Sequence, residues 1–247
     1  MTLTSLTHQV RFPSDSDAEL SQDQEWCEVL LDEGWTRIRF HDYAAIYAIP
    51  GLYEHLFYER LKCQSPAVVS ALLAEAVEAE GDDPAALPVL DLGAGNGMVG
   101  EALREHGFEE ITGVDITPEA GEAAERDRPG LYADYHVCDL LDPPEDVAEE
   151  LHEARFGAMT SVAALGFGDV PPEVFTAAFG LVGDGGWIAF TIKEDFLDGA
   201  DESGFAALIA GMLRSGAIEE RDRRRYQHRL DVTGEPIHYV AIAGIKR

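Results

Sequence analysis

The chain has 247 residues, which suffices for one α/β domain with a substantial core, or for one such domain with an appendage. Asp and Glu number 47 against 18 Lys and Arg, giving a formal net charge of −29. A surface this acidic argues against general nucleic-acid binding, because neutralising phosphates requires a basic face. The three cysteines are far apart and form no C-x-x-C pattern, which argues against a disulfide framework and a zinc site, so we expect no metal.

The charge also bears on the source and location of the protein. Only three cations are lysine, Lys62, Lys193 and Lys246. An acidic surface with little lysine favours a halophilic source, because salt near 1 M shortens the screening length to about 3 Å. The alternative is an ordinary acidic bacterial protein encoded by GC-rich DNA. No apolar run approaches the roughly 18 residues of a membrane span and the start lacks a signal-peptide pattern, so we expect a cytoplasmic protein without membrane contact.

The first third of the chain is predicted to form an extension in front of the main domain. Residues 1–22 are polar and are expected to form a tail without a core. Residues 23–84 are predicted to be helical and contain many aromatic side chains, with Pro50 and Gly51 breaking one helix. Apolar residues at helical spacing predict a further helix over 67–80.

Residues 88–100 are the most informative segment. A short apolar strand that contains Asp91 runs into three alternating glycines, Gly93, Gly95 and Gly97, and a helix over 98–106 follows at once. This order places backbone N–H groups and the positive end of a helix dipole beside a ligand. Glycine also lets the backbone approach that ligand closely.

Strands and helices then alternate to the end of the chain. The predicted strands are 111–115, 133–139, 157–161 and 185–192, and the predicted helices begin near 118 and 145 and cover 171–179 and 205–213. A hairpin over 223–230 and 237–245 follows. Alternation implies a parallel sheet, and the hairpin supplies one reversed strand. We therefore predict a Rossmann-like α/β fold over 85–247, with a seven-stranded, mostly parallel sheet, one antiparallel strand and helices on both faces.

Two cofactor classes use such a glycine turn. Residues 95–100 fit the G-x-G-x-x-G pattern of nicotinamide enzymes, and Asp115 lies 20 residues after Gly95, the spacing of a ribose-binding acid. Against this interpretation, Asp91 lies inside the strand, where a dinucleotide fold normally has an apolar residue. Counted from Gly93, the third glycine position is held by Met98, and Asp139 closes the next strand.

The segments D-L-G-A-G-N-G (91–97), V-D (114–115) and C-D-L (138–140) together resemble the class I S-adenosylmethionine-dependent methyltransferases. The resemblance implies that the three glycines face the methionine moiety, that Asp115 accepts hydrogen bonds from the ribose and that Ile116 packs on the adenine. It also implies that Asp139 accepts from the adenine amine and that Asp91 orders the glycine turn. The remaining cofactor-binding positions that it implies are Ala94, Leu140 and Ser161.

Candidates for a general base or for substrate contacts are Tyr43, Tyr47, His41 and Asp195, with Glu194 beside the last. Tyr43 and Tyr47 share one helix face at i, i+4 spacing, and in related enzymes a tyrosine-rich helix before the core often covers the cofactor as part of a lid. Plain aromatic packing is the alternative. The arginines of segment 221–229 either pair with the abundant acids or form an anion site.

The acceptor is expected to be a small molecule. The Asp/Asn-Pro-Pro-aromatic segment that amino-methylating DNA and RNA enzymes carry after the fourth strand is replaced here by S-V-A-A-L-G-F-G (161–168). Within the class, three segments look similar to the small-molecule methyltransferase-like proteins of the Williams–Beuren group: G-V-D-I (113–116), G-L-Y (130–132) and S-V-A-A-L-G (161–166). We expect in-line methyl transfer from S-adenosylmethionine by a monomer or homodimer. The alternatives are an NAD(P)-dependent oxidoreductase and a non-catalytic S-adenosylmethionine-binding protein.

Overall fold

The computed structural model describes residues 8–13, 20–165, 170–194 and 204–247. Seven strands form its main sheet, in the order β6-β5-β4-β7-β8-β10-β9. Their bounds are β4 (Val89–Leu92), β5 (Ile111–Asp115), β6 (Asp134–Val137), β7 (Phe156–Ser161), β8 (Val182–Lys193), β9 (Ile218–Leu230) and β10 (Pro236–Lys246). The five strands β4 to β8 are parallel, and β10 lies antiparallel between β8 and β9. The predicted sheet is therefore confirmed, including its single reversed strand.

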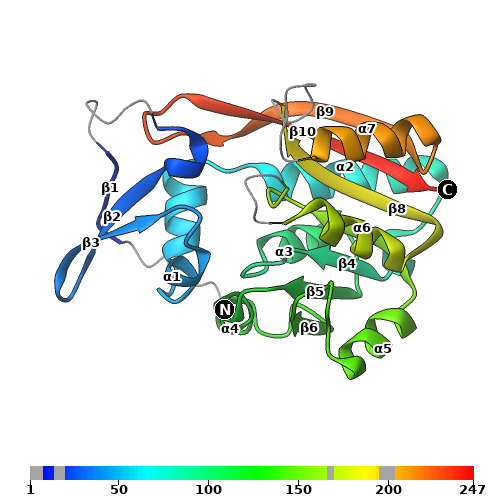
Figure 1. Ribbon diagram of the computed structural model, residues 1–247, viewed down its shortest axis with the longest axis horizontal. Coiled ribbons are helices and arrows are strands. Elements are labelled where there is room, and N and C mark those ends of the chain that lie inside the picture. The colour runs from blue at the N-terminus through cyan, green and yellow to red at the C-terminus, as the bar shows by residue number, and fades with distance from the viewer. Residues whose placement is uncertain (1–7, 14–19, 166–169, 195–203) are drawn as a thin grey trace.

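Helices cover both faces of this sheet (Figure 1). On one face pack α2 (Ser65–Glu80) and α3 (Met98–Glu105), and on the other α5 (Glu145–Glu153), α6 (Pro172–Leu181) and α7 (Phe205–Ser215). The helix α4 (Pro118–Asp127) contacts β5 and β6. Side chains alternate across each strand, so in β8 Trp187 packs toward α2, whereas Ile188 and Phe190 pack toward α6 and α7.

Most element boundaries agree with the sequence pattern. The predicted strand 111–115 and the helix start at Met98 are confirmed. The strand expected over 133–139 is shorter, 134–137, so Asp139 lies two residues beyond its end. The strand expected over 185–192 begins earlier, at Val182, and the first hairpin strand begins at Ile218.

The prediction of an all-helical region over 23–84 is wrong for residues 26–39. These residues form β2 (Trp26–Leu31) and β3 (Gly34–Arg39), which join β1 (Val10–Arg11) in a three-stranded antiparallel sheet. The burial of β2 alternates, with Cys27 and Val29 fully buried between more exposed neighbours, which is the period of a strand rather than of a helix. The tail also differs from expectation, because Val10 and Phe12 pack against the core beneath this sheet.

Helical structure begins after this sheet, with α1 (Tyr43–Tyr47) and a wide π-type turn, η3 (Glu54–Arg60). Short 3-10 turns, η2 (Gln22–Gln24) and η4 (Pro84–Ala86), flank the region. The small sheet, α1 and η3 share a separate apolar core that includes Val29, Phe40 and Leu56. This N-terminal unit stands beside the end of the main sheet (Figure 1). Within the described ranges, no helix combines the length and the apolar character needed to cross a membrane.

Candidate functional site

A cavity of about 520 Å³ lies at the carboxyl ends of β4, β5 and β6. This is the edge at which open α/β sheets bind ligands, and the volume falls within the range of small-molecule sites. The sequence-predicted residues that line it are Gly93, Asp115, Ile116, Asp139 and Leu140, together with His41, Tyr43 and Tyr47 of the N-terminal unit. Residues far apart in the chain thus meet at one site.

The glycine turn between β4 and α3 forms the floor of the site. Gly93, Gly95 and Gly97 have positive φ of 73°, 55° and 92°, which L-residues with side chains rarely adopt. A side chain at Gly95 would collide with the Tyr47 hydroxyl, so this turn packs directly beneath α1. Gly97 was expected to face the ligand, but it does not line the cavity. A Cβ there would meet Leu131 and Arg128, so this glycine is needed for packing behind the turn.

Asp115 is the last residue of β5 and connects the glycine turn to the wall of the cavity by hydrogen bonds. Its Oδ2 accepts a hydrogen bond from the Gly95 N–H at 2.9 Å, and its Oδ1 accepts one from the Thr117 N–H at 2.9 Å. Burial raises the pKa of this carboxyl group, and the backbone N–H donors oppose that shift. Asp115 borders the cavity, so its carboxylate can accept hydrogen bonds from hydroxyl groups of a ligand there.

Two neighbours on the same wall differ in character. Ile116 is 64% exposed although it is apolar, and it borders the cavity, so a ligand with a flat apolar face would cover it. Asp139 is exposed and accepts a hydrogen bond from the Leu141 N–H at 2.9 Å, while Leu140 is buried beside it. This wall offers apolar contact and hydrogen-bond acceptors side by side.

Asp91 is fully buried behind the turn and does not line the cavity. It accepts hydrogen bonds from the Tyr132 hydroxyl and the Thr160 hydroxyl, each at 2.9 Å, and burial raises its pKa to about 6. The Tyr135 hydroxyl donates to the Gly95 carbonyl at 2.7 Å. Tyr132, whose hydroxyl also lies 3.5 Å from the Ala94 carbonyl, connects Asp91 to the turn. The sequence analysis assigned no role to Tyr132 or Tyr135, because no spacing rule marks them.

The tyrosines of the N-terminal unit cover the turn. The rings of Tyr43 and Tyr47 stack with centroids 6.1 Å apart, as their i, i+4 spacing predicts, and Tyr53 lies 5.0 Å from Tyr47. Burial raises the pKa of Tyr47 well above its usual range, so its phenol keeps its proton at neutral pH. As a protonated phenol, Tyr47 can donate a hydrogen bond or pack against a ligand.

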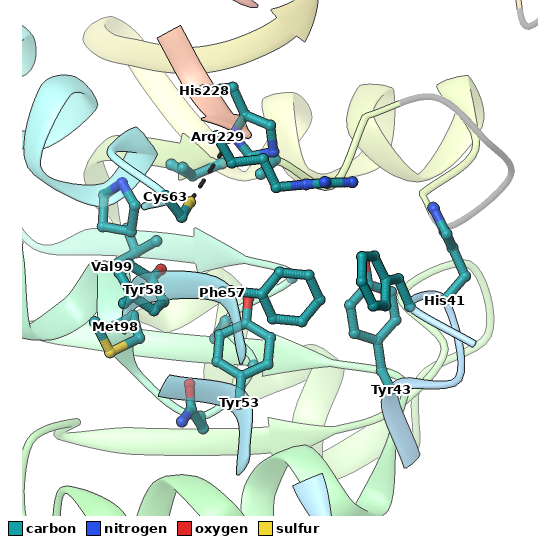
Figure 2. A pocket seen from close by; sticks show the side chains of 18 of the residues that line it. His41, Tyr43, Tyr53, Phe57, Tyr58, Cys63, Met98, Val99, His228 and Arg229 are labelled. Atoms are coloured by element: carbon teal, nitrogen blue, oxygen red, sulfur yellow. Dashed lines mark hydrogen bonds between the residues drawn. The ribbon is translucent and has the colours of Figure 1, made fainter. Parts of the chain in front are cut away.

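A second, narrower cavity of about 60 Å³ continues inward from the same wall (Figure 2). It shares His41, Tyr43, Tyr47, Tyr53 and Gly93 with the first cavity. Further in, its lining comes from the N-terminal unit, from α2 and from the hairpin β9–β10, and includes Phe57, Tyr58, Cys63, His228, Arg229 and Tyr239. We refer to these two spaces as the outer and the inner cavity.

Arg128 ties the N-terminal unit to the glycine turn. It donates to Glu54 at 2.9 Å and to the Asn96 carbonyl at 3.0 Å, and its Nε pairs with Glu101 at 2.9 Å. The Asn96 side chain donates to the same Glu54 carboxylate at 2.7 Å. Charge-assisted hydrogen bonds therefore connect the N-terminal unit to the glycine turn.

The other predicted positions lie apart from the outer cavity. Ala94 lines the inner cavity, whereas Ser161 is buried and its hydroxyl has no partner among the described residues. Asp195 lies outside the described residues. Glu194 pairs with Arg225 at 2.8 Å. The other arginines of segment 221–229 also pair with acids, Arg221 with Glu80, Arg223 with Glu220, Arg224 with Glu75 and Arg229 with Glu25, as the ion-pairing interpretation expects.

The sequence matches the profile of a family described as a methyltransferase domain, over residues 61–232. The human methyltransferase-like protein 27 is 33% identical over 136 residues, which are 51% of this chain and 53% of that protein. The chain thus matches about half the length of this curated relative.

Two solved structures share the fold. The N-methyltransferase NodS from Bradyrhizobium japonicum, solved with S-adenosyl-L-homocysteine, is 15% identical, with a TM-score of 0.55 over 84% of this chain and 97% of NodS. The protein 1320 of Thermoplasma acidophilum is 16% identical, with a TM-score of 0.50 over 72% of this chain and 85% of its own.

Proposed function

The chain belongs to the methyltransferase domain family, and from this premise we propose that it transfers a methyl group from S-adenosylmethionine to a small-molecule acceptor by in-line displacement. One observation carries the proposal. Asp115 and Ile116 at the end of β5 and Asp139 after β6 meet the glycine turn around a single cavity of about 520 Å³.

The lining of the outer cavity fits the proposed cofactor. Asp115 would accept hydrogen bonds from the two ribose hydroxyls, which a carboxylate does well. Ile116, 64% exposed, would gain burial against the adenine, with Leu140 beside the ring and Asp139 accepting from the amine. The turn at Gly93 and Ala94 would leave room for the methionine part. That NodS was solved with S-adenosyl-L-homocysteine supports this choice of cofactor.

The junction of the two cavities is where methyl transfer would take place. Gly93, Tyr47 and Tyr53 border both cavities, so a group bound in the outer one can face a group bound in the inner one. S-adenosylmethionine supplies an activated methyl on a sulfonium. The protein's task is then to align nucleophile, methyl and sulfur and to exclude water, and alignment alone accounts for a large share of such rate enhancements.

The size of the inner cavity favours a small acceptor. At about 60 Å³ it admits a small molecule or the reactive end of a slightly larger one, well below the space that drug-sized ligands occupy. The net charge of −29 also opposes a nucleic-acid acceptor. The N-terminal unit, which supplies one side of the inner wall, would serve as the cover of the acceptor site.

Incubation with methyl-tritiated S-adenosylmethionine and a cell extract separated into small molecules, proteins and nucleic acids tests this function. We expect label in the small-molecule fraction, with release of S-adenosylhomocysteine, and loss of both in Asp115→Ala. A matched control is Asp134→Ala, because Asp134 is exposed at the opposite end of β6. Label confined to protein or nucleic acid would contradict a small-molecule acceptor, and no label in any fraction would contradict the transfer itself.

A further inference from the structure

The wall of the inner cavity is almost free of net charge in a protein that carries −29. Among the described residues that line it, Arg229 is the one with a permanent charge, and none is Asp or Glu. We propose that the inner cavity selects an uncharged acceptor, held by hydrogen bonds to neutral groups around His228. This inference rests on the proposed function, because it specifies the acceptor of that same site.

The charge of Arg229 is already balanced. Its guanidinium pairs with Glu25, and both side chains are buried, with 3% and 1% of their surface exposed. Arg229 also donates to the Leu230 carbonyl at 2.8 Å, and Glu25 accepts from the Val232 N–H at 2.9 Å. A buried pair completed in this way has no net charge to offer, so an anionic ligand would have to compete with Glu25 for Arg229.

A β-bulge turns His228 and Arg229 toward the same interior. Ile237 of β10 pairs with Arg229, whereas His238 pairs with Gln227, so His228 is the extra residue on β9. In a regular strand two consecutive side chains would point to opposite faces, but here both are buried and both line the cavity. Bulges often re-aim side chains in this way next to active sites. Figure 2 shows His228 and Arg229 together along one side of the hollow, across from Phe57 and Tyr53.

The hydrogen-bonding groups of this wall are neutral. His228 Nδ1 lies 2.7 Å from the Ser65 hydroxyl, which in turn lies 2.6 Å from the Tyr226 hydroxyl, and the imidazole stacks on Tyr239 at 4.1 Å. Nδ1 is therefore engaged, and Nε2 is the nitrogen available to a ligand. Burial, together with the charge of Arg229, holds the pKa of His228 well below its usual range, so the ring stays neutral.

A second neutral group accompanies His228. Gln22 donates to the Tyr239 hydroxyl at 2.8 Å, and its own Oε1 is buried without a partner among the described residues. Gln22 lines the inner cavity, so a ligand hydroxyl or N–H could satisfy this oxygen. Phe40, Phe57 and Tyr58 complete the wall with aromatic rings. A charged ligand would lose its hydration here without gaining an opposite charge, whereas an uncharged polar ligand would find partners for its hydrogen bonds.

Three probes small enough for a cavity of about 60 Å³ and nearly identical in shape test the charge selection: acetamide, acetate and acetamidinium. Each is titrated into the full chain saturated with S-adenosylhomocysteine at pH 7.5, with binding followed by saturation-transfer NMR and calorimetry. We expect acetamide to bind at least about tenfold more tightly than either ion, which corresponds to about 1.4 kcal/mol. Equal or tighter binding of an ion would overturn the inference, and so would the absence of binding by all three.

The S-adenosylhomocysteine titration is evaluated first and on its own. If this ligand fails to bind, the proposed function fails, and the three probes are then compared on the free chain. If it binds and the charge order is reversed, only the acceptor inference fails. The two failures are therefore distinguishable.

Two variants test whether the charge selection arises at Arg229 and His228. Glu25→Gln leaves the charge of Arg229 unbalanced, so acetate should gain at least about tenfold in affinity relative to acetamide. The matched control is Glu28→Gln, because Glu28 pairs with the exposed Arg11 outside the cavity. His228→Phe should weaken the binding of acetamide, whereas His238→Phe on the neighbouring strand should not. If a thermal scan shows Glu25→Gln to be unfolded, the comparison of probes on the unaltered chain still decides.

Discussion

Replacing Asp115 with alanine should weaken the binding of S-adenosylmethionine by about 1.5–3 kcal/mol, because hydrogen bonds to a charged group contribute this much. At 1.4 kcal/mol per factor of ten, the dissociation constant should rise about 10- to 150-fold. The structure adds a second reason for a loss. The Gly95 and Thr117 N–H groups, which both donate to Asp115 at 2.9 Å, would lose their partner, so the glycine turn would be less well ordered.

Calorimetric titration with S-adenosylmethionine and S-adenosylhomocysteine measures this change for both ligands. Asp115→Asn should give a smaller loss, because the amide keeps one acceptor oxygen of the same size. Asp134→Ala serves as the control and should bind like the unaltered chain. An unchanged affinity in an Asp115→Ala variant that unfolds at the same temperature as the control would refute the ribose assignment.

Three further predictions concern the turn, the buried acid and the surface. Gly95→Ala places a Cβ against the Tyr47 hydroxyl at a φ of 55°, so S-adenosylmethionine should bind at least about tenfold more weakly; Tyr47→Phe in that background should restore part of the affinity by calorimetry. Because the folded-state pKa of Asp91 is raised to about 6, protonation stabilises the fold at low pH and this contribution is lost as pH rises through 6. Urea unfolding should show that the stability difference between the unaltered chain and Asp91→Asn shifts in favour of the variant by about 2 kcal/mol from pH 4.5 to 7.5, and a constant difference would contradict this. Finally, the net charge of −29 predicts that Tm rises by several degrees between 0.1 and 2 M KCl, and a flat or falling Tm in thermal scans would argue against a halophilic source.

The main sheet and the outer cavity were predictable because both depend on local patterns. The apolar run before Gly93 fixes a strand, and the carboxyl ends of parallel strands meet at one edge. Asp115 therefore had to lie near the turn, and its carboxylate is indeed 2.9 Å from the Gly95 N–H. The strand-turn-helix order and the 20-residue spacing were therefore sufficient to predict that Asp115 lies beside the turn.

The N-terminal unit was not predictable to the same extent. Residues 23–84 were predicted to be helical, but Trp26 and Trp35 in this region lie on a half-exposed sheet, where Arg37 and Arg11 stack on their rings at 3.6 and 3.4 Å. Aromatic residues are common in strands, so the aromatic content of this region did not by itself support a helix.

The inner cavity depends on contacts that no local pattern encodes. The arginines of segment 221–229 were visible in the sequence, but regular alternation would have placed His228 and Arg229 on opposite faces. His228 and Arg229 both face the site because of the bulge at His228 and because Arg229 pairs with Glu25, which is 204 residues away.

Binding of the cofactor itself is the most direct test of this account. Calorimetric titration of the full chain with S-adenosylmethionine, S-adenosylhomocysteine and NADH, at low and at multimolar salt, compares the proposed cofactor with the nicotinamide alternative. The account predicts micromolar binding of the first two and none of NADH. Binding of NADH alone would contradict it, and Asp139 would then lose its assigned contact with the adenine amine.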